Sequence, residues 1–139
     1  MRIYIAAPLF SPSERAFNER LASSLEFIGD VYLPQRDGTL IEGHAKGTEI
    51  EVADLCRAVF QEDLQAVRRS DVVVAVLDGR ALDEGVCIEV GFAKALGKRI
   101  VGFKSDIRLA LPWGQNPLVA GCIDAWASSL DGVASVLKT

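Results

Sequence analysis

The chain has 139 residues, of which 50% are hydrophobic and 24% are charged, a balance that predicts a single domain with one core over residues 1–139. Its 15 basic and 19 acidic residues give a formal net charge of -4, and no run of Lys and Arg is longer than the pair Arg68-Arg69. This pattern excludes the extended positive surface of a nucleic-acid-binding protein and indicates a small ligand.

Short apolar runs alternate with stretches of helical periodicity, and together they predict five strands connected through helices. The strands are expected at residues 3–7, 31–33, 72–77, 99–103 and 123–126. The helices are expected at residues 12–28, 48–69, 83–97 and 130–137, with a loop over 34–47. Two helix starts carry a capping-box pattern with a carboxylate three residues after the cap: Ser11-Pro12-Ser13-Glu14 and Thr48-Glu49-Ile50-Glu51.

The third predicted strand, Val72 to Leu77, has no polar residue on either face. Such runs, joined through helices, are typical of a parallel sheet that is covered on both sides. We therefore predict a three-layer, doubly wound α/β fold of the flavodoxin or Rossmann type, with five parallel strands and helices on both faces. Ligands of such folds bind beyond the carboxyl ends of the strands, so the loops after Ala7, Leu33 and Leu77 should line the site.

Two acidic residues fall where core side chains are expected. In a helix capped by Asp83, Glu89 shares a face with only apolar or small residues: Gly85, Val86, Phe92, Ala93 and Leu96. Asp63 lies in the same way among Val59, Phe60 and Val67. An ionised carboxylate without partners costs several kcal/mol to bury, so these positions indicate either boundary residues that reach water or a functional site. Two such acids that share a site would divide into proton donor and nucleophile.

Other polar residues have a structural alternative beside the functional one. Asp83 fits an N-cap as well as a ligand contact, and the two roles are compatible. Tyr4, inside the first strand, could be a packed aromatic or could donate a hydrogen bond to a buried carboxylate. Ser11 and Ser13 could hold a phosphate at a helix start, although capping explains them.

Cysteine and histidine usage argues against metal and disulfide chemistry. The three cysteines, Cys56, Cys87 and Cys122, form no C-x-x-C pair, and we expect reduced thiols in the core of a cytoplasmic protein. The only histidine, His44, is expected in a polar loop, which leaves multi-histidine metal sites and Ser-His-Asp triads without their central residue. No apolar stretch is long enough for a membrane span, and no glycine-rich phosphate loop occurs.

Four motifs, in this order and spacing, resemble the nucleoside 2-deoxyribosyltransferase family. They are Tyr4-Ile5-Ala6-Ala7-Pro8-Leu9-Phe10, Leu33-Pro34-Gln35-Arg36-Asp37-Gly38, Asp63 eight residues before Asp71, and Asp83-x-Gly85-x-x-x-Glu89-x-Gly91-x-Ala93. The match covers most of the chain. The resemblance implies that Glu89 is the nucleophile, that Tyr4 supports it, and that Asp83 and Asp63 contact the base.

The same resemblance implies the remaining features of the site. Further substrate contacts are expected at matched positions: Ala7, Phe10, Gln35, Asp37 and Gly85. A neighbouring subunit of a homo-oligomer would complete the sugar pocket with an asparagine that corresponds to Asn116. The implied reaction exchanges the bases of 2′-deoxyribonucleosides against free nucleobases by a retaining double displacement at Glu89, without metal or organic cofactor. No nucleic acid or membrane is expected as a partner.

Departures from the family pattern leave alternatives open. Many relatives have Gly-Thr-Ala where this chain has Gly85-Val86-Cys87, and glycine in place of Ala7, so the base pocket could be narrower or more apolar. A deoxynucleoside 5′-monophosphate N-glycosidase would use a similar fold and glutamate, with Ser11, Ser13 and Arg15 as its phosphate cradle. A non-catalytic nucleotide-binding or flavin-binding module is the alternative from a different class.

Overall fold

The computed structural model describes residues 1–39 and 49–139. Five strands make up the sheet: β1 (Arg2–Ala6), β2 (Asp30–Tyr32), β3 (Val72–Val76), β4 (Arg99–Phe103) and β5 (Ala125–Ala127). The helices of the described ranges are α1 (Pro12–Leu25), α2 (Pro34–Asp37), α3 (Glu49–Arg69), α4 (Glu84–Ala95), α5 (Pro117–Cys122) and α6 (Leu130–Leu137).

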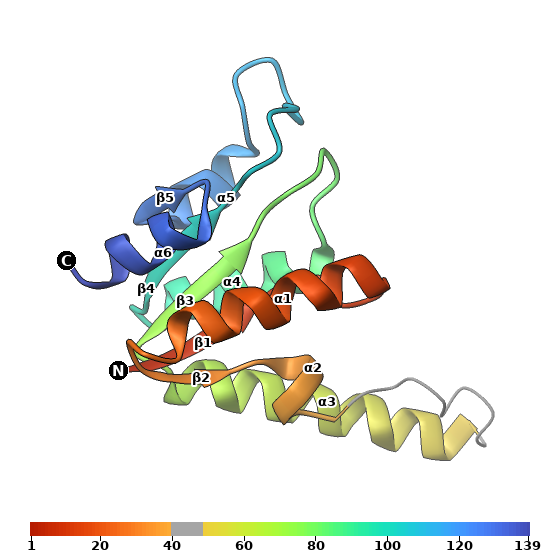
Figure 1. The fold of residues 1–139 in the computed structure, drawn as a ribbon. Helices are drawn as coiled ribbons and strands as arrows, with labels where there is room; N and C mark the ends of the chain where they lie inside the picture. The colour runs from red at the N-terminus through yellow and green to blue at the C-terminus, as the bar shows by residue number, and fades with distance from the viewer. Residues whose placement is uncertain (40–48) are drawn as a thin grey trace.

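All strand pairs are parallel, and the strands lie in the order β2-β1-β3-β4-β5 (Figure 1). The chain first adds β2 on one side of β1 and then crosses to add β3 on the other side. The strand order therefore reverses between β1 and β3, and the space beyond their carboxyl ends is where a doubly wound fold binds its ligand. The predicted fold class is confirmed.

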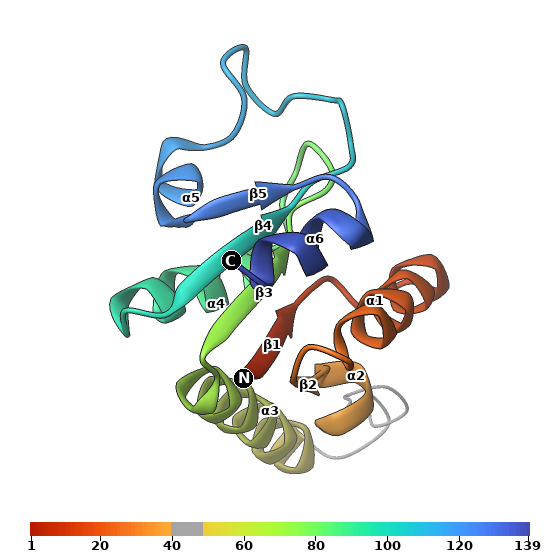
Figure 2. The same ribbon diagram turned by 60° about the vertical axis from the view of Figure 1, so that its left-hand side comes forward.

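Helices cover both faces of the sheet, and each face has its own core (Figure 2). The helices α1 and α6 pack on one face, over side chains such as Ile3, Ile5 and Val74. The helices α3 and α4 pack on the other, over Tyr4 and Val73. All five residues of β3 are buried, as its uninterrupted apolar run predicts.

The first helix starts as its capping box predicts. The Ser11 hydroxyl accepts a hydrogen bond from the Glu14 N–H at 3.3 Å, and the Glu14 carboxylate accepts one from the Ser11 N–H at 2.8 Å. The helix ends at Leu25 rather than near residue 28, because the N–H groups of Ile28 and Gly29 both turn back to the Leu25 carbonyl. The predicted cap Thr48 and the histidine at position 44 lie outside the described residues.

Two short helices were not expected from the sequence. The helix α2 lies inside the predicted loop, where Pro34 occupies the first turn and the Asp37 carboxylate accepts the Leu33 N–H at 2.8 Å. The helix α5 begins at Pro117, directly after its N-cap Asn116, and has six residues. Each is too short to show a helical period. The strand expected at residues 123–126 is found at Ala125–Ala127.

The described parts of the chain, 1–39 and 49–139, hold no helix that has both the length and the apolar character needed to cross a bilayer. The expectation that all three cysteines lie in the core was wrong for Cys56, which is exposed on α3, whereas Cys87 and Cys122 are half-buried. Cys56 lies one helical turn before Phe60, which is also exposed, so the two side chains share an exposed face of α3.

Candidate active site

The pairing of Tyr4 with Glu89 is the centre of the candidate site. Tyr4 lies in the middle of β1, directly opposite Val73 of β3, and is fully buried at 0% exposure. Its hydroxyl donates a hydrogen bond of 2.5 Å to Oε1 of Glu89, which comes from α4. The contact joins residues 85 positions apart in the sequence, at the switch point between β1 and β3. Oε2 accepts no hydrogen bond from any residue within 1–39 and 49–139, so it is available to another group.

Burial controls the charge of this pair. Desolvation raises the pKa of Glu89 to about 8, against the opposing effect of the Tyr4 hydrogen bond, and the nearby carboxylates of Asp63 and Asp83 raise it further. Desolvation, and next the charge of Glu89, raise the pKa of Tyr4 far above its usual value. The phenol therefore keeps its proton at every working pH and remains a donor to Glu89.

Asp63 faces the same pair from α3. Its charge acts on Tyr4, on Glu89 and on Tyr32, so it lies within electrostatic range of all three. Burial, and then the neighbouring Glu62, raise the pKa of Asp63 to about 6. The structure shows no hydrogen bond to the Asp63 carboxyl from the residues it describes. A half-buried acid in this state is suited to meet a polar ligand atom.

Asp83 precedes α4 and serves as its N-cap. Its Oδ1 accepts the Val86 N–H at 2.9 Å, as the capping alternative predicts. A side chain at Gly85 would place its Cβ 3.1 Å from the same oxygen, so the glycine keeps space beside the carboxylate. Glu89 lies in the same helix and is within electrostatic range of Asp83. Capping therefore holds Asp83 close to the buried pair.

Gln35 and Asp37, two of the residues expected to contact substrate, make structural hydrogen bonds here. The Gln35 carbonyl oxygen accepts from Nδ2 of the buried Asn18 at 2.9 Å, and Asn18 also donates to the Pro8 carbonyl. This network ties α1 to the loop after β1 and to α2. The Asp37 carboxylate caps the Leu33 N–H and forms an ion pair with Arg36 at 3.1 Å.

Ala7, Phe10 and Asn116 make no hydrogen bond to Tyr4 or Glu89. Ala7 packs against the core under α1 and α6. Phe10 is 75% exposed at the start of α1. Asn116 caps α5, where its Oδ1 accepts the Leu118 N–H at 2.9 Å, and it lines a cavity of about 360 Å³ together with Cys87.

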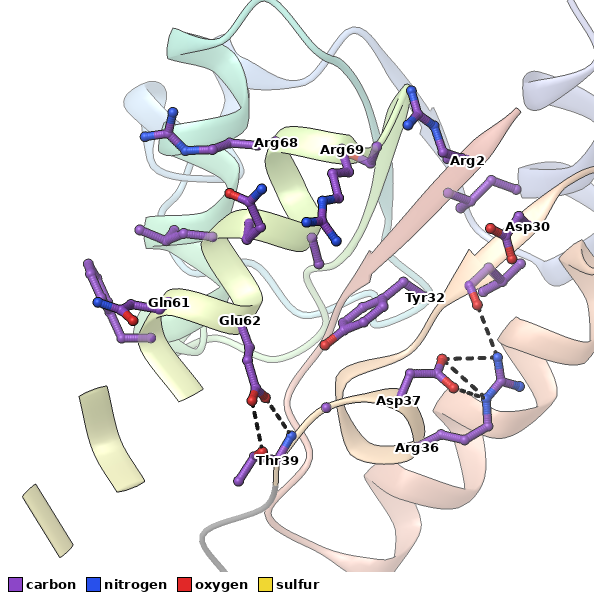
Figure 3. Close-up of a pocket in the computed structure, with 18 residues that line it drawn as sticks. Arg2, Asp30, Tyr32, Arg36, Asp37, Thr39, Gln61, Glu62, Arg68 and Arg69 are labelled. Atoms are coloured by element: carbon purple, nitrogen blue, oxygen red, sulfur yellow. Dashed lines mark hydrogen bonds and ion pairs between the residues drawn. The ribbon is translucent and has the colours of Figure 1, made fainter. Parts of the chain in front are cut away.

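A larger cavity of about 1170 Å³ opens beside the edge strand β2, between α2 and α3 (Figure 3). Glu89 does not line it, nor does it line the smaller cavity. The wall residue that connects the large cavity to the site is Tyr32, whose ring stacks on Tyr4 with centroids 5.6 Å apart. The sequence reasoning missed Tyr32. Each tyrosine lies in a short strand between apolar residues, but that the two are paired follows from the register of β1 and β2.

A comparison with models of protein families matches residues 3–128 to the family described as nucleoside 2-deoxyribosyltransferase. The chain belongs to this family. The family comprises nucleoside deoxyribosyltransferases and related glycosidases, enzymes that act on N-glycosidic bonds. The resemblance inferred from the four motifs is therefore confirmed.

Within residues 1–39 and 49–139, no group of three or more His, Cys, Asp and Glu side chains is arranged to hold a metal ion.

Individual relatives agree with this family membership. A nucleoside deoxyribosyltransferase of Limosilactobacillus fermentum is 29% identical over 136 residues, which span 94% of this chain and 80% of that protein. A conserved protein from Enterococcus faecalis superposes with a TM-score of 0.79 at 25% identity, covering 99% of this chain and 97% of that one.

Two further solved structures show the same fold. A 2-deoxyribosyltransferase from Bacillus psychrosaccharolyticus has a TM-score of 0.78 at 19% identity and covers 99% and 96% of the two chains. A CMP N-glycosidase from Clostridium botulinum has a TM-score of 0.62 at 20% identity and covers both chains fully, at 100%. At these identities the likeness concerns the fold and leaves the activity open.

The buried acid of this family member should make its stability depend on pH. The folded chain holds a proton on Glu89 up to about pH 8, whereas the unfolded chain releases it near the ordinary pKa of 4.5. The folded state thus binds more protons between these values, and the free energy of unfolding should fall as pH rises from about 4.5 to 8. Glu89→Gln should remove this slope and be the more stable protein at pH 8, by on the order of 3 kcal/mol.

Urea unfolding of both proteins at a series of pH values measures this difference. The two curves should coincide near pH 4 and separate steadily up to pH 8. Parallel curves over the whole range would mean that Glu89 ionises in the folded protein as it does in water.

Proposed function

We propose that this protein exchanges the base of 2′-deoxyribonucleosides through a covalent deoxyribosyl intermediate on Glu89. The observation that carries the proposal is the 2.5 Å hydrogen bond from the buried Tyr4 hydroxyl to Oε1 of Glu89. It fixes one oxygen of a desolvated carboxylate and leaves the other for a carbon electrophile. A non-catalytic binding module gains nothing from an acid in such a place, which is costly to bury.

The chemistry is a double displacement. Oε2 of Glu89 forms a bond to C1′ of the sugar while the N-glycosidic bond breaks and its electron pair leaves with the base. Asp83, acting as the acid, gives its proton to the departing base. A nitrogen of the incoming base then attacks C1′ from the vacated face, its proton passes to Asp83, and Glu89 departs as the carboxylate. Two inversions return the original configuration.

The proposed nucleophile must lose its proton before it can attack. Since the pKa of Glu89 is raised to about 8, the limb of the pH profile that Glu89 controls should rise about tenfold in kcat/KM per pH unit below that value. Tyr4→Phe removes the hydrogen bond that favours the ionised form, so the midpoint of this acid limb should move to higher pH. Initial rates across a pH series measure both effects. An acid limb that is centred near pH 4.5 and is unmoved by Tyr4→Phe would contradict this assignment.

The experiment that tests the function separates three outcomes in one run. The protein is incubated with deoxyinosine, with and without free adenine, and products are followed by chromatography. Deoxyadenosine formed only when adenine is present supports transfer. Release of hypoxanthine at the same rate in both samples indicates a hydrolase. No change in either sample indicates a binding protein and overturns the proposal.

A second candidate is an N-glycosidase acting on a nucleoside 5′-monophosphate, and the fold shared with the CMP N-glycosidase favours testing it. A phosphate cradle after β1 would need Ser11, Ser13 and Arg15. The Ser11 hydroxyl already accepts the Glu14 N–H and lies 3.2 Å from the Ser13 hydroxyl, so helix capping accounts for it. We rank this reaction second. Deoxyinosine monophosphate in place of deoxyinosine, in the same assay, distinguishes the two substrates.

The proposed site is shared between subunits of a homo-oligomer, with Asn116 completing the pocket of a neighbouring copy. Large apolar side chains near Asn116 and on α4 support this, since Leu118 is 83% exposed and Ile88 is 62% exposed. Exposed apolar groups of this size commonly mark an interface. Asn116 itself is exposed, and its Oδ1 accepts the Leu118 N–H rather than contacting Tyr4 or Glu89.

Mixing two inactive variants should restore activity if the site is shared. Glu89→Gln and Asn116→Ala would each be inactive alone, but a mixed oligomer contains sites with Glu89 from one chain and Asn116 from the other. The variants are mixed, exchanged under mild denaturant and assayed for base exchange. Activity that stays at the level of the separate variants, in oligomers shown to be mixed by mass, would exclude a shared site.

A further inference from the structure

Tyr32 of β2 lies beside Tyr4 of β1 because the parallel register pairs these two residues directly. Both side chains point to the face of the sheet that α3 and α4 cover. Their rings are nearly parallel, with an interplanar angle of 12° and centroids 5.6 Å apart. Offset stacking at this distance is an attractive arrangement of two aromatic rings.

The two rings have different surroundings. Tyr4 is fully buried and uses its hydroxyl for Glu89. Tyr32 is half-buried, lines the large cavity beside β2, and extends toward α3 in Figure 3. No residue of the described ranges forms a hydrogen bond with the Tyr32 hydroxyl. A Cβ atom at position 38 would lie only 2.9 Å from the Tyr32 hydroxyl oxygen, so Gly38 leaves the space in which this hydroxyl lies.

The hydrogen bond from Tyr4 to Glu89 depends on the direction of one C–O bond at the end of a long side chain. A phenol that turns about its Cα–Cβ bond would carry its oxygen away from Oε1. On the side of β2, the flat surface that faces the Tyr4 ring is Tyr32. The groups that act electrically on Glu89 are Tyr4 from β1, Asp63 from α3 and Asp83 before α4. Tyr32 is not one of them; it touches the pair through the ring of Tyr4, and it shares with Glu89 the influence of the Asp63 charge.

We propose that Tyr32 is a positioning residue, whose stacked ring holds the Tyr4 phenol on Glu89 and whose hydroxyl is not needed for this role. The inference rests on the proposed function for its kinetic consequence, but the interaction itself exists without substrate. The stacked pair Tyr4 and Tyr32 would then serve to orient the Tyr4 hydroxyl. Tyr32, which lines the large cavity, would also help to keep the hydrogen bond to the buried Glu89 in place.

Three variants separate the ring from the hydroxyl. Tyr32→Phe keeps the stack and removes the oxygen, Tyr32→Leu removes the stack, and Tyr4→Phe removes the hydrogen bond itself. The first readout is the titration midpoint of Glu89, followed by carbon-detected NMR of its side-chain carboxyl in the protein without substrate. Tyr32→Phe should leave the midpoint in place. Tyr32→Leu should move it to higher pH, in the same direction as Tyr4→Phe, because the carboxylate loses its donor.

The second readout is a double-mutant cycle on base exchange. Tyr32→Leu should lower kcat about tenfold with KM changed less than about twofold, whereas the same substitution in a Tyr4→Phe background should lower kcat less than about twofold further. Equal losses in the two backgrounds would overturn the proposal, because Tyr32 would then act independently of Tyr4. Equal losses from Tyr32→Phe and Tyr32→Leu would also overturn it, because the hydroxyl would then be the active part.

A second variant and a measurement without turnover cover the cases in which Tyr32→Leu does not fold or the protein is not a transferase. If Tyr32→Leu does not fold, Tyr32→Met fills the volume with a flexible chain that has no flat face and is tested in its place. The NMR titration needs no turnover, so an unmoved midpoint refutes the positioning role even if the protein is a transferase. Conversely, a moved midpoint in a protein that fails the deoxyinosine assay would refute the proposed function and leave the aromatic support intact.

Discussion

Glu89→Gln is expected to reduce base exchange by at least about a thousandfold, which corresponds to about 4 kcal/mol of transition-state stabilisation. The substitution keeps the shape of the side chain, and the amide oxygen can still accept the hydrogen bond from Tyr4. The amide, however, cannot form and release an ester bond to C1′. The loss should therefore appear in kcat, while the binding of deoxyinosine and the fold are retained.

A matched control is Glu84→Gln, which removes an exposed carboxylate from the first turn of the same helix. It should retain nearly full activity. Mass spectrometry of the wild type, quenched during turnover without an acceptor base, should show a fraction that carries one deoxyribosyl group on a peptide containing Glu89. Activity of Glu89→Gln above about a tenth of the wild type, a barrier change below roughly 1.4 kcal/mol, would exclude Glu89 as the nucleophile.

Asp83→Asn should lower base exchange by about a hundredfold to ten-thousandfold, the usual contribution of a general acid. Asparagine is as good an N-cap as aspartate, so α4 and the thermal stability should be preserved. The amide has no proton to give to a departing base. The loss should be smallest for a nucleoside whose base leaves readily without protonation, because such a substrate has less need of an acid.

The control for this prediction is Asp131→Asn, an exposed acid in the first turn of α6 on the opposite face of the sheet. It should leave both rate and stability unchanged. If Asp83→Asn lowers exchange equally for good and poor leaving groups, then Asp83 contributes as a fixed contact to the base and a different residue supplies the proton.

The strands and long helices, whose apolar residues recur at a regular spacing, were predictable from the sequence, and so was the pair of Tyr4 and Glu89. An uninterrupted apolar run between two helical stretches is typical of a central strand between two layers, and helical spacing places Glu89 on the buried side of α4. The positions of Gln35 and Asp37 were not predictable in the same way. The partner of Gln35 is Asn18 of α1, and this contact depends on how α1 and α2 meet, which no local pattern records. The Asp37 carboxylate accepts the Leu33 N–H only four residues away, but inside a helix too short to show a period.

The same limit explains why Tyr32 escaped notice. A tyrosine in a strand is ordinary, and its contact with Tyr4 depends on the register between two strands separated by a whole helix. Short helices such as α5 are set by an asparagine and a proline rather than by periodicity. Tertiary contacts, rather than propensity, decide such features.

The enclosed carboxylate of Glu89 has a consequence for directed evolution of this protein. A neutral side chain that fills the same space removes an unfavourable buried charge and stabilises the fold. Selection for resistance to heat at alkaline pH therefore favours variants that have lost the catalytic carboxylate. A library sorted only for robustness should therefore accumulate inactive sequences altered at position 89, and selections for durable catalysts from this scaffold need turnover as a second criterion.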